Sequence, residues 1–306
     1  MKKYIILFVL TVTAGWVSAQ QELMISQYMF NGLVLNPAYA GSHPYWSASA
    51  LHRSQWVKFD NAPTTQTICL DGPIANRKFG VGLTISNDQL GVTKQMEFGL
   101  NGAAKFGLAN GTLSLGLRFA GSNYSANLNE VSVWDANDPL YANNINNAMT
   151  FKGGFGAYYS EKKWFVGLSI PTIFSSDKNL IPAGSDIKRY FQSHYYLNGG
   201  MVFEVNPSLA IKPSVLLKYQ TAAPIELDLN CNLLFFQKFW FGLGYRSGDA
   251  VIAMIEWNIT QQLRLGYAYD YTTTAIGNYS SGSHEVMLGF DFGKNVNIKA
   301  RSPRYF

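Results

Sequence analysis

Four histidines and a serine beside one of them are the first candidates for acid–base or nucleophilic chemistry in this sequence. The histidines are His43, His52, His194 and His284. None stands in a His-Glu-x-x-His pair or beside spaced cysteines, so the sequence predicts neither a metal site nor a cofactor. Ser283 directly precedes His284 and could pair with it as the nucleophile and base of a hydrolase. A turn histidine beside a Ser-Gly sequence explains the pair more simply, so we predict no catalytic residues and no enzymatic activity.

Other signatures of chemistry are missing as well. The sequence contains no nucleophile elbow, phosphate-binding loop or dinucleotide fingerprint. Gly-x-Gly sequences at 80–82 and 242–244 fall inside alternating apolar segments, where glycine marks a small residue that faces an interior. Cys69 and Cys231 lie in separate predicted strands and nothing in the sequence pairs them. We therefore interpret both cysteines as packing residues.

The N-terminus has the pattern of an export signal. Lys2 and Lys3 precede an apolar run at 4–13, and the small residues at 17–19 are typical of a signal peptidase site. The run falls short of the ~20 residues that a membrane-spanning helix needs. We predict a signal peptide at 1–19 that is cleaved before Gln20.

The composition is unusual for a soluble protein. Only 14% of residues are charged and 15% are aromatic, whereas soluble domains carry about 25% charged residues. Apolar residues facing lipid and small polar residues facing a lumen would give this mixture. The net charge of +5 includes a basic tail at 294–306, which we predict to be periplasmic. It does not indicate nucleic-acid binding.

Apolar and polar residues alternate along nearly the whole chain. From 225 to 235 the odd-numbered residues are apolar, while Glu226 and Asp228 lie on the opposite face. The same period of two returns at 113–119, 239–246 and 263–271, which is typical of β-strands. The predicted strands begin near Tyr45, Pro63, Lys78, Lys94, Gly111, Phe151, Lys163, Ser193, Ser208, Ile225, Phe239, Asp249, Gln262 and Ser283.

Short connections alternate with connections that are often longer along the predicted strands. Every second one is tight, whereas the others include long segments at 122–150, 171–192 and 272–282. Short periplasmic turns that alternate with longer outer loops are typical of membrane barrels. We therefore predict an all-β, antiparallel transmembrane barrel of about fourteen strands at 45–293 in a Gram-negative outer membrane, with both chain ends in the periplasm.

Charged residues on the polar face have both signs. Mixed signs favour ion pairs across a narrow or plugged lumen over a wide selective pore. The lumen-facing charges that we single out are Arg118, Glu226, Asp228, Arg246, Arg264 and Asp270.

The segment at 20–44 precedes the first strand and is apolar for a free periplasmic tail. We favour a plug inside the lumen. A docking segment for a periplasmic partner and a short structural lead-in are the alternatives.

The same region resembles a known family. The run at 27–42, which includes Asn-Pro-Ala-Tyr-Ala-Gly, is similar to the signature of PorP/SprF proteins, outer-membrane components of the Bacteroidetes type IX secretion system. The resemblance extends to 53–56, 62–66, 267–270, 283–285 and 302–306. The residues that match the family motif are Asn36, Pro37, Ala38, Tyr39, Gly41, Arg53 and Trp56.

The resemblance implies a non-enzymatic barrel that works in protein secretion, surface display and gliding motility. Its implied partners are the outer-membrane lipid, the secretion translocon and the C-terminal domain of a secreted cargo or adhesin, with periplasmic ring or peptidoglycan-tethering proteins as further candidates. It carries over no catalytic residues, and the motif residues have either an architectural or a partner-binding role. The alternative function is a channel or a transporter of hydrophobic solutes.

Overall fold

The computed structural model describes residues 24–131, 143–176, 180, 191–221 and 223–292. The predicted signal peptide at 1–19 and the basic tail at 294–306 lie outside these ranges, so both remain predictions. Within the described ranges, no helix is long and apolar enough to cross a membrane.

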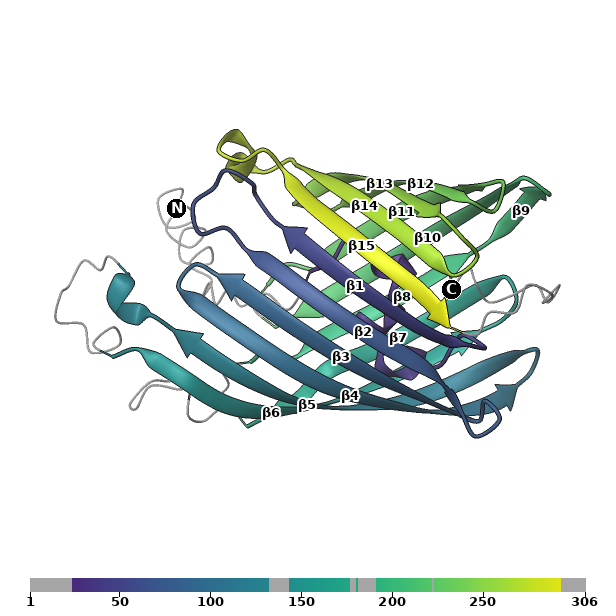
Figure 1. The fold of residues 1–306 in the computed structure, drawn as a ribbon, viewed down its shortest axis with the longest axis horizontal. Coiled ribbons are helices and arrows are strands. Elements are labelled where there is room, and N and C mark those ends of the chain that lie inside the picture. Colours follow the sequence, from purple (N-terminus) through teal and green to yellow (C-terminus); the bar gives the residue numbers. More distant parts are fainter. Residues whose placement is uncertain (1–23, 132–142, 177–179, 181–190, 222, 293–306) are drawn as a thin grey trace, which may run out of the picture.

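The described residues form a closed antiparallel β-barrel of fourteen strands, as predicted (Figure 1). The segments β8 and β9 are two parts of one wall strand, interrupted at Val202, and both pair with β10. The ring is continuous because β1 pairs with β15 and β10 pairs with β11. The strands are β1 (Trp46–Ser54), β2 (Thr64–Ile74), β3 (Phe79–Leu90), β4 (Thr93–Leu108), β5 (Gly111–Ala126), β6 (Ile145–Ser160), β7 (Trp164–Ser175), β8 (His194–Met201), β9 (Phe203–Asn206), β10 (Leu209–Gln220), β11 (Glu226–Phe235), β12 (Phe239–Arg246), β13 (Ala250–Asn258), β14 (Leu263–Thr272) and β15 (Ser283–Phe292).

Alternation along each strand sorts the side chains into an outer and an inner face. In β12, Leu243 is 69% exposed on the outer face, whereas Trp240 and Arg246 are buried on the inner face. Leu117 in β5 is similarly exposed at 68%. Outward apolar side chains of this size are what a lipid-facing wall presents.

The two ends of the barrel differ in their connections. Connections 127–144 and 176–193 emerge at one end, which we call the long-loop end. Connections 75–78, 109–110 and 207–208 lie at the other end, which we call the short-turn end. The long connections therefore gather at one end of the barrel, as predicted, although connection 91–92 at that end is also tight.

Two of the predicted loops are too long. β5 continues to Ala126 and β6 begins at Ile145, so the predicted loop at 122–150 loses residues at both ends. β7 likewise runs to Ser175, beyond the predicted loop start at 171. Asparagine is depleted in strands, so the asparagine-rich sequence at the start of β6 predicts a loop. Pairing with β5, for example between Tyr124 and Ala148, overrides that preference.

Only one of the two cysteines packs in the interior of the barrel. Cys69 is buried on the inner face of β2, whereas Cys231 is exposed on the outer face of β11. Both are free thiols.

Candidate functional site inside the barrel

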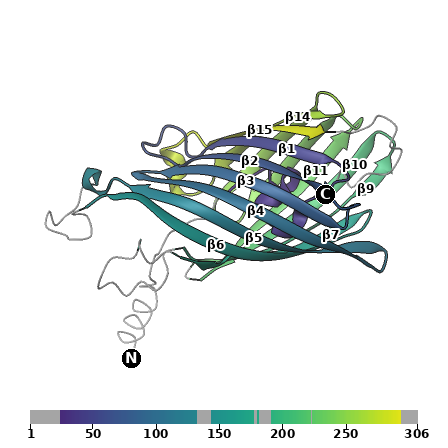
Figure 2. The ribbon, with the colours of Figure 1, turned by 60° about the horizontal axis from the view of Figure 1, so that its bottom comes forward.

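The lumen contains the chain that precedes β1. Its 3-10 helices η1 (Tyr28–Phe30), η2 (Gly32–Val34) and η3 (Pro37–Tyr39) lie inside the ring of strands in both views (Figures 1 and 2). Leu33, Ala38 and Ala40 are almost fully buried there. We call the described residues 24–44 the plug.

Glycines on the inner wall make room for the plug. A Cβ atom added at Gly80 would lie 1.9 Å from the carbonyl oxygen of Ala40, and one added at Gly116 would lie 2.2 Å from the nitrogen of Ala38. Gly156 is as close to the side chain of Asn36. These glycines come from β3, β5 and β6, so we call them the glycine seat. Only a residue without a side chain lets the motif lie this close to the wall.

The motif also bonds to the wall through its ends. Asn36 Oδ1 accepts from the backbone N–H of Ala38 and caps η3, while Asn36 Nδ2 donates to the carbonyl of Ala157 at 3.0 Å. At the other end, the backbone N–H of Gly41 donates to Asp71 Oδ2 at 2.8 Å. Gly41 has a φ of +64°, a left-handed conformation that favours glycine. Asn36 and Gly41 thus have architectural contacts in this structure.

Two buried tyrosines of the plug remain neutral. Asn230 Nδ2 donates to the phenol oxygen of Tyr28 at 2.7 Å, and the hydroxyl of Tyr39 lies 3.0 Å from His43 Nε2. Burial raises the pKa of both phenols above their usual range. Both phenols therefore make their hydrogen bonds as neutral groups.

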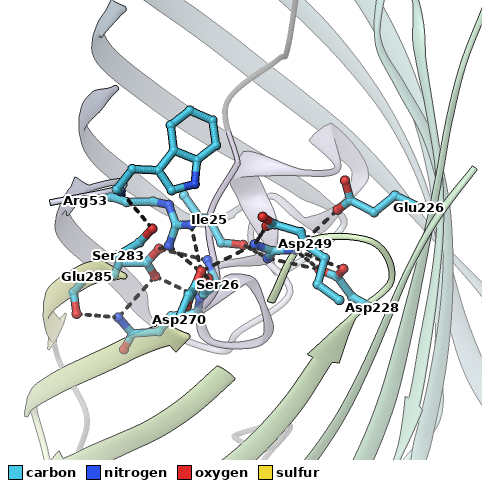
Figure 3. A network of polar contacts seen from close by, with 12 residues as sticks. Ile25, Ser26, Arg53, Glu226, Asp228, Asp249, Asp270, Ser283 and Glu285 are labelled. Atoms are coloured by element: carbon cyan, nitrogen blue, oxygen red, sulfur yellow. Dashed lines mark hydrogen bonds and ion pairs between the residues drawn. The ribbon is translucent and has the colours of Figure 1, made fainter. Parts of the chain in front are cut away.

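A charged network fixes the beginning of the plug near the long-loop end (Figure 3). Arg53 Nη2 donates to Asp270 Oδ2 at 2.7 Å, and Arg53 Nη1 donates to Glu285 Oε2 at 3.2 Å. The Glu285 carboxylate accepts the backbone N–H groups of Ser26 and Gln27, each at 2.8 Å. We call these five residues the latch. They tie the plug to β1, β14 and β15 through buried, charge-assisted hydrogen bonds.

Arg246 extends the latch to β11 and β12. Its Nε and Nη2 donate to the two carboxylate oxygens of Asp228, each at 3.1 Å. Its Nη1 lies 3.5 Å from Asp270, and its Nη2 is 3.5 Å from the carbonyl of Ile25. Glu226 is 3.3 Å from Nε. Arg246 is fully buried, so these carboxylates neutralise it inside the wall.

The other singled-out charges also form ion pairs. Arg118 lies 2.6 Å from Glu97, which is equally close to Lys152. Arg264 lies 3.4 Å from Asp291 nearer the short-turn end. Every one of the six charges singled out in the sequence therefore has an oppositely charged neighbour across the inner wall.

The described path of the plug runs along the barrel. Ser26 lies near the long-loop end with the latch, whereas Gly41 lies at the short-turn end, where β1 begins. The expectation that both chain ends are periplasmic concerns residues outside the described ranges.

Two hollows that open to solvent flank the plug. One, of about 50 Å³, lies at the short-turn end and is lined by Phe30 and Trp240 among others. The other, also of about 50 Å³, is lined by Leu35, Glu97 and Arg118. Different residues of the plug line the two hollows.

A filled barrel whose motif is seated against the wall can be compared with known families. A family model described as type IX secretion system membrane protein PorP/SprF matches residues 17–290. The chain belongs to the PorP/SprF family. In this PorP/SprF protein, the motif residues Asn36 to Gly41 are the part of the plug that occupies the glycine seat.

Solved structures are similar to this PorP/SprF protein in their barrels. Omp33 of Acinetobacter baumannii is 10% identical, with a TM-score of 0.48 over 82% of this chain and 100% of that one. A Pseudomonas aeruginosa FadL homologue is 12% identical, with a TM-score of 0.44. The match covers 87% of this chain and 94% of the homologue. Outer membrane phospholipase A of Escherichia coli is 12% identical, with a TM-score of 0.40. The match covers 80% of this chain and 91% of the phospholipase. Likeness at this level carries no functional information. No curated protein matches the chain.

The serine and histidine of the hydrolase alternative point to opposite faces of β15. Ser283 is buried on the inner side, where its Oγ accepts the backbone N–H of Trp56 at 3.2 Å. His284 lies on the outer face, with Nδ1 2.7 Å from the hydroxyl of Tyr267. The two side chains therefore do not form a nucleophile and base. Among the described residues, no group of histidine, cysteine or acidic side chains could hold a metal ion.

Sequence reasoning missed some residues of the site. Ser26 and Gln27 donate to Glu285 through backbone N–H groups, which residue types do not predict, and Ser26 Oγ also donates to Asp270 at 2.7 Å. Gly116 lies on the polar face of the alternating segment at 113–119, but the sequence predicts neither its contact with the plug nor that of Gly156. Their spacing on neighbouring strands would have indicated a seat only if the strand register had been known, because Gly116 and Gly156 are directly paired.

Proposed function

We propose that this PorP/SprF protein is a non-enzymatic accessory barrel of type IX secretion, which binds the C-terminal domain of one secreted or surface-anchored protein and the translocon. The family supports a role in type IX secretion. The seated plug supports a role in binding rather than in conduction, because it fills the lumen that a solute would need.

The orientation follows from the connections. We place the short-turn end in the periplasm and the long-loop end outside, as is usual for outer-membrane barrels. The long-loop end, with the latch beneath it, is then the surface offered to a cargo domain. The short-turn end faces the periplasmic ring or peptidoglycan-tethering proteins. Export of the chain itself relies on the signal peptide at 1–19.

A channel or hydrophobic-solute transporter is the alternative function. It requires a continuous passage past the plug, whereas Gly80, Gly116 and Gly156 hold the motif in van der Waals contact with the wall. Solute uptake by cells that carry the wild-type barrel would favour this alternative. The accessory role predicts no uptake above that of cells without the barrel.

Deleting the gene tests the accessory role. We expect one large surface protein with a secretion-type C-terminal domain to remain inside the cell, because its carrier is missing, while other cargo is still exported. Comparison of surface and whole-cell proteomes measures this. A plasmid copy of the wild-type gene should restore the export of that protein. Unchanged export of every such protein would rule the proposal out.

A further inference from the structure

The hollow at the short-turn end is built from aromatic rings and buried charges. Phe30 of the plug and Trp240 of β12 meet edge to face, with ring centroids 5.8 Å apart. Lys212 and Glu256, each 2% exposed, lie in the same wall. Aromatic walls with a few charged groups suit a peptide segment that combines aromatic and basic side chains.

Such a segment begins at the edge of the hollow. Asp291 lines the hollow, and β15 ends one residue later at the short-turn end (Figure 1). The sequence that follows, 293–306, contains Lys294, Lys299, Arg301 and Arg304 together with an aromatic pair, Tyr305 and Phe306. We propose that the hollow is the binding site of this tail, with Tyr305 and Phe306 against the rings of Phe30 and Trp240 and with Arg304 beside the carboxylates of the wall.

The reach of the tail is sufficient. An extended chain spans roughly 3.3 Å per residue, so Tyr305 can lie up to about 40 Å from Phe292. The hollow starts beside Asp291, so the chain needs only part of this length and can turn back. Because the tail is tethered next to the site, its effective concentration is on the order of millimolar, and weak contacts suffice to hold it.

The charges of the wall accommodate an arginine. Arg264 lies 3.4 Å from Asp291, and Glu256 is within electrostatic reach of both Lys212 and Arg264. The carboxylates of Asp291 and Glu256 thus belong to one charged network. A further guanidinium can join it, because each guanidinium carries five N–H donors. The flat guanidinium can at the same time stack on Trp240, the ring that binds cations best.

Disulfide trapping in the full-length chain tests the proposal. Cys69 and Cys231 are replaced by alanine, and a Ser302→Cys, Gln237→Cys pair is introduced, since Gln237 lies at the exposed edge of the hollow. The control pair is Ser302→Cys with Asn110→Cys, in an exposed turn at the same end but on the other side of β15 in the ring. We expect at least about fivefold more intramolecular disulfide in the first pair, because tethered docking raises the local concentration.

A second variant separates docking from random encounter. When Tyr305→Ala and Phe306→Ala are added to the Ser302→Cys, Gln237→Cys chain, the disulfide yield should fall to that of the control pair. Heat-modifiable gel migration shows that the barrel of this variant is folded. Equal yields in the two cysteine pairs, or a yield that the alanines do not change, would overturn the proposal. Trapping of another protein instead would assign the hollow to a partner and overturn it as well. Cargo export is not used as a readout, so the result is independent of the proposed function.

Discussion

Replacing Gly116 by valine is expected to drive the plug from its seat. The new Cβ would lie 2.2 Å from the nitrogen of Ala38 and 2.5 Å from its Cα, and these are backbone atoms that cannot rotate away. Overpacking of this kind costs about 1–3 kcal/mol where the structure can adjust. Here the wall strand is fixed by pairing on both sides, so the plug has to move. Single-channel recordings in planar bilayers should change from silent to conducting.

The matched control lies beside it in the same wall. Gly102, on the neighbouring strand β4, has open space around its would-be Cβ atom, and its side-chain position faces outward. Gly102→Val adds the same isopropyl group and should stay silent. Conductance from both variants would indicate general damage to the barrel, and silence from Gly116→Val would show that the plug is not seated as described.

Replacing Arg246 by methionine is expected to cost the largest share of stability of any single change in the latch region. The variant leaves Asp228 buried without its two-point partner and removes the donor to the carbonyl of Ile25. Breaking one partner of a buried pair costs about 3–5 kcal/mol, because the remaining charge is desolvated and uncompensated. The free energy of unfolding, measured by urea titration in lipid vesicles, should fall by about 3 kcal/mol or more.

Two further variants identify the cause of this loss. Adding Asp228→Asn to the Arg246→Met chain should recover part of the loss, since the orphaned carboxylate is then removed. Arg77→Met changes an exposed arginine in the β2–β3 turn and should stay within about 0.5 kcal/mol of the wild type. A loss under about 1 kcal/mol for Arg246→Met would mean that water, rather than the wall, solvates Asp228.

Much of the barrel could be predicted because its signal is periodic. Alternation assigns Leu243 to lipid and Arg246 to the lumen without knowledge of any contact, and the strand starts at Gly111, Phe239 and Ser283 are reproduced by the structure. Strand ends were harder to predict. The asparagines around Ile145 have weak strand preference, and only pairing with β5 shows that they continue the hairpin.

Some residues of the candidate site were predictable, but their partners were not. Arg53 and Asp270 could be singled out, one by the family motif and one by its position in a strand. That they lie 2.7 Å apart depends on the closure of the ring, which places β1 beside β15 and β14. The contacts of Asn36 likewise depend on the pairing of β6 with β7, which supply Gly156 and Gly167 beside its side chain. Contacts between residues this distant in sequence follow from topology, which local patterns do not encode.

The latch joins the two extremes of the sequence, and this sets an order for biogenesis. Ser26 bonds to Glu285 across 259 positions and to Asp270 across 244. The acceptors are therefore among the last described residues to leave the ribosome, and the donors among the first. Contacts of such high sequence separation form late and slowly. An unfinished or truncated chain without β14 and β15 has no acceptors for Ser26, so the latch can form only once the polypeptide extends through its final strand.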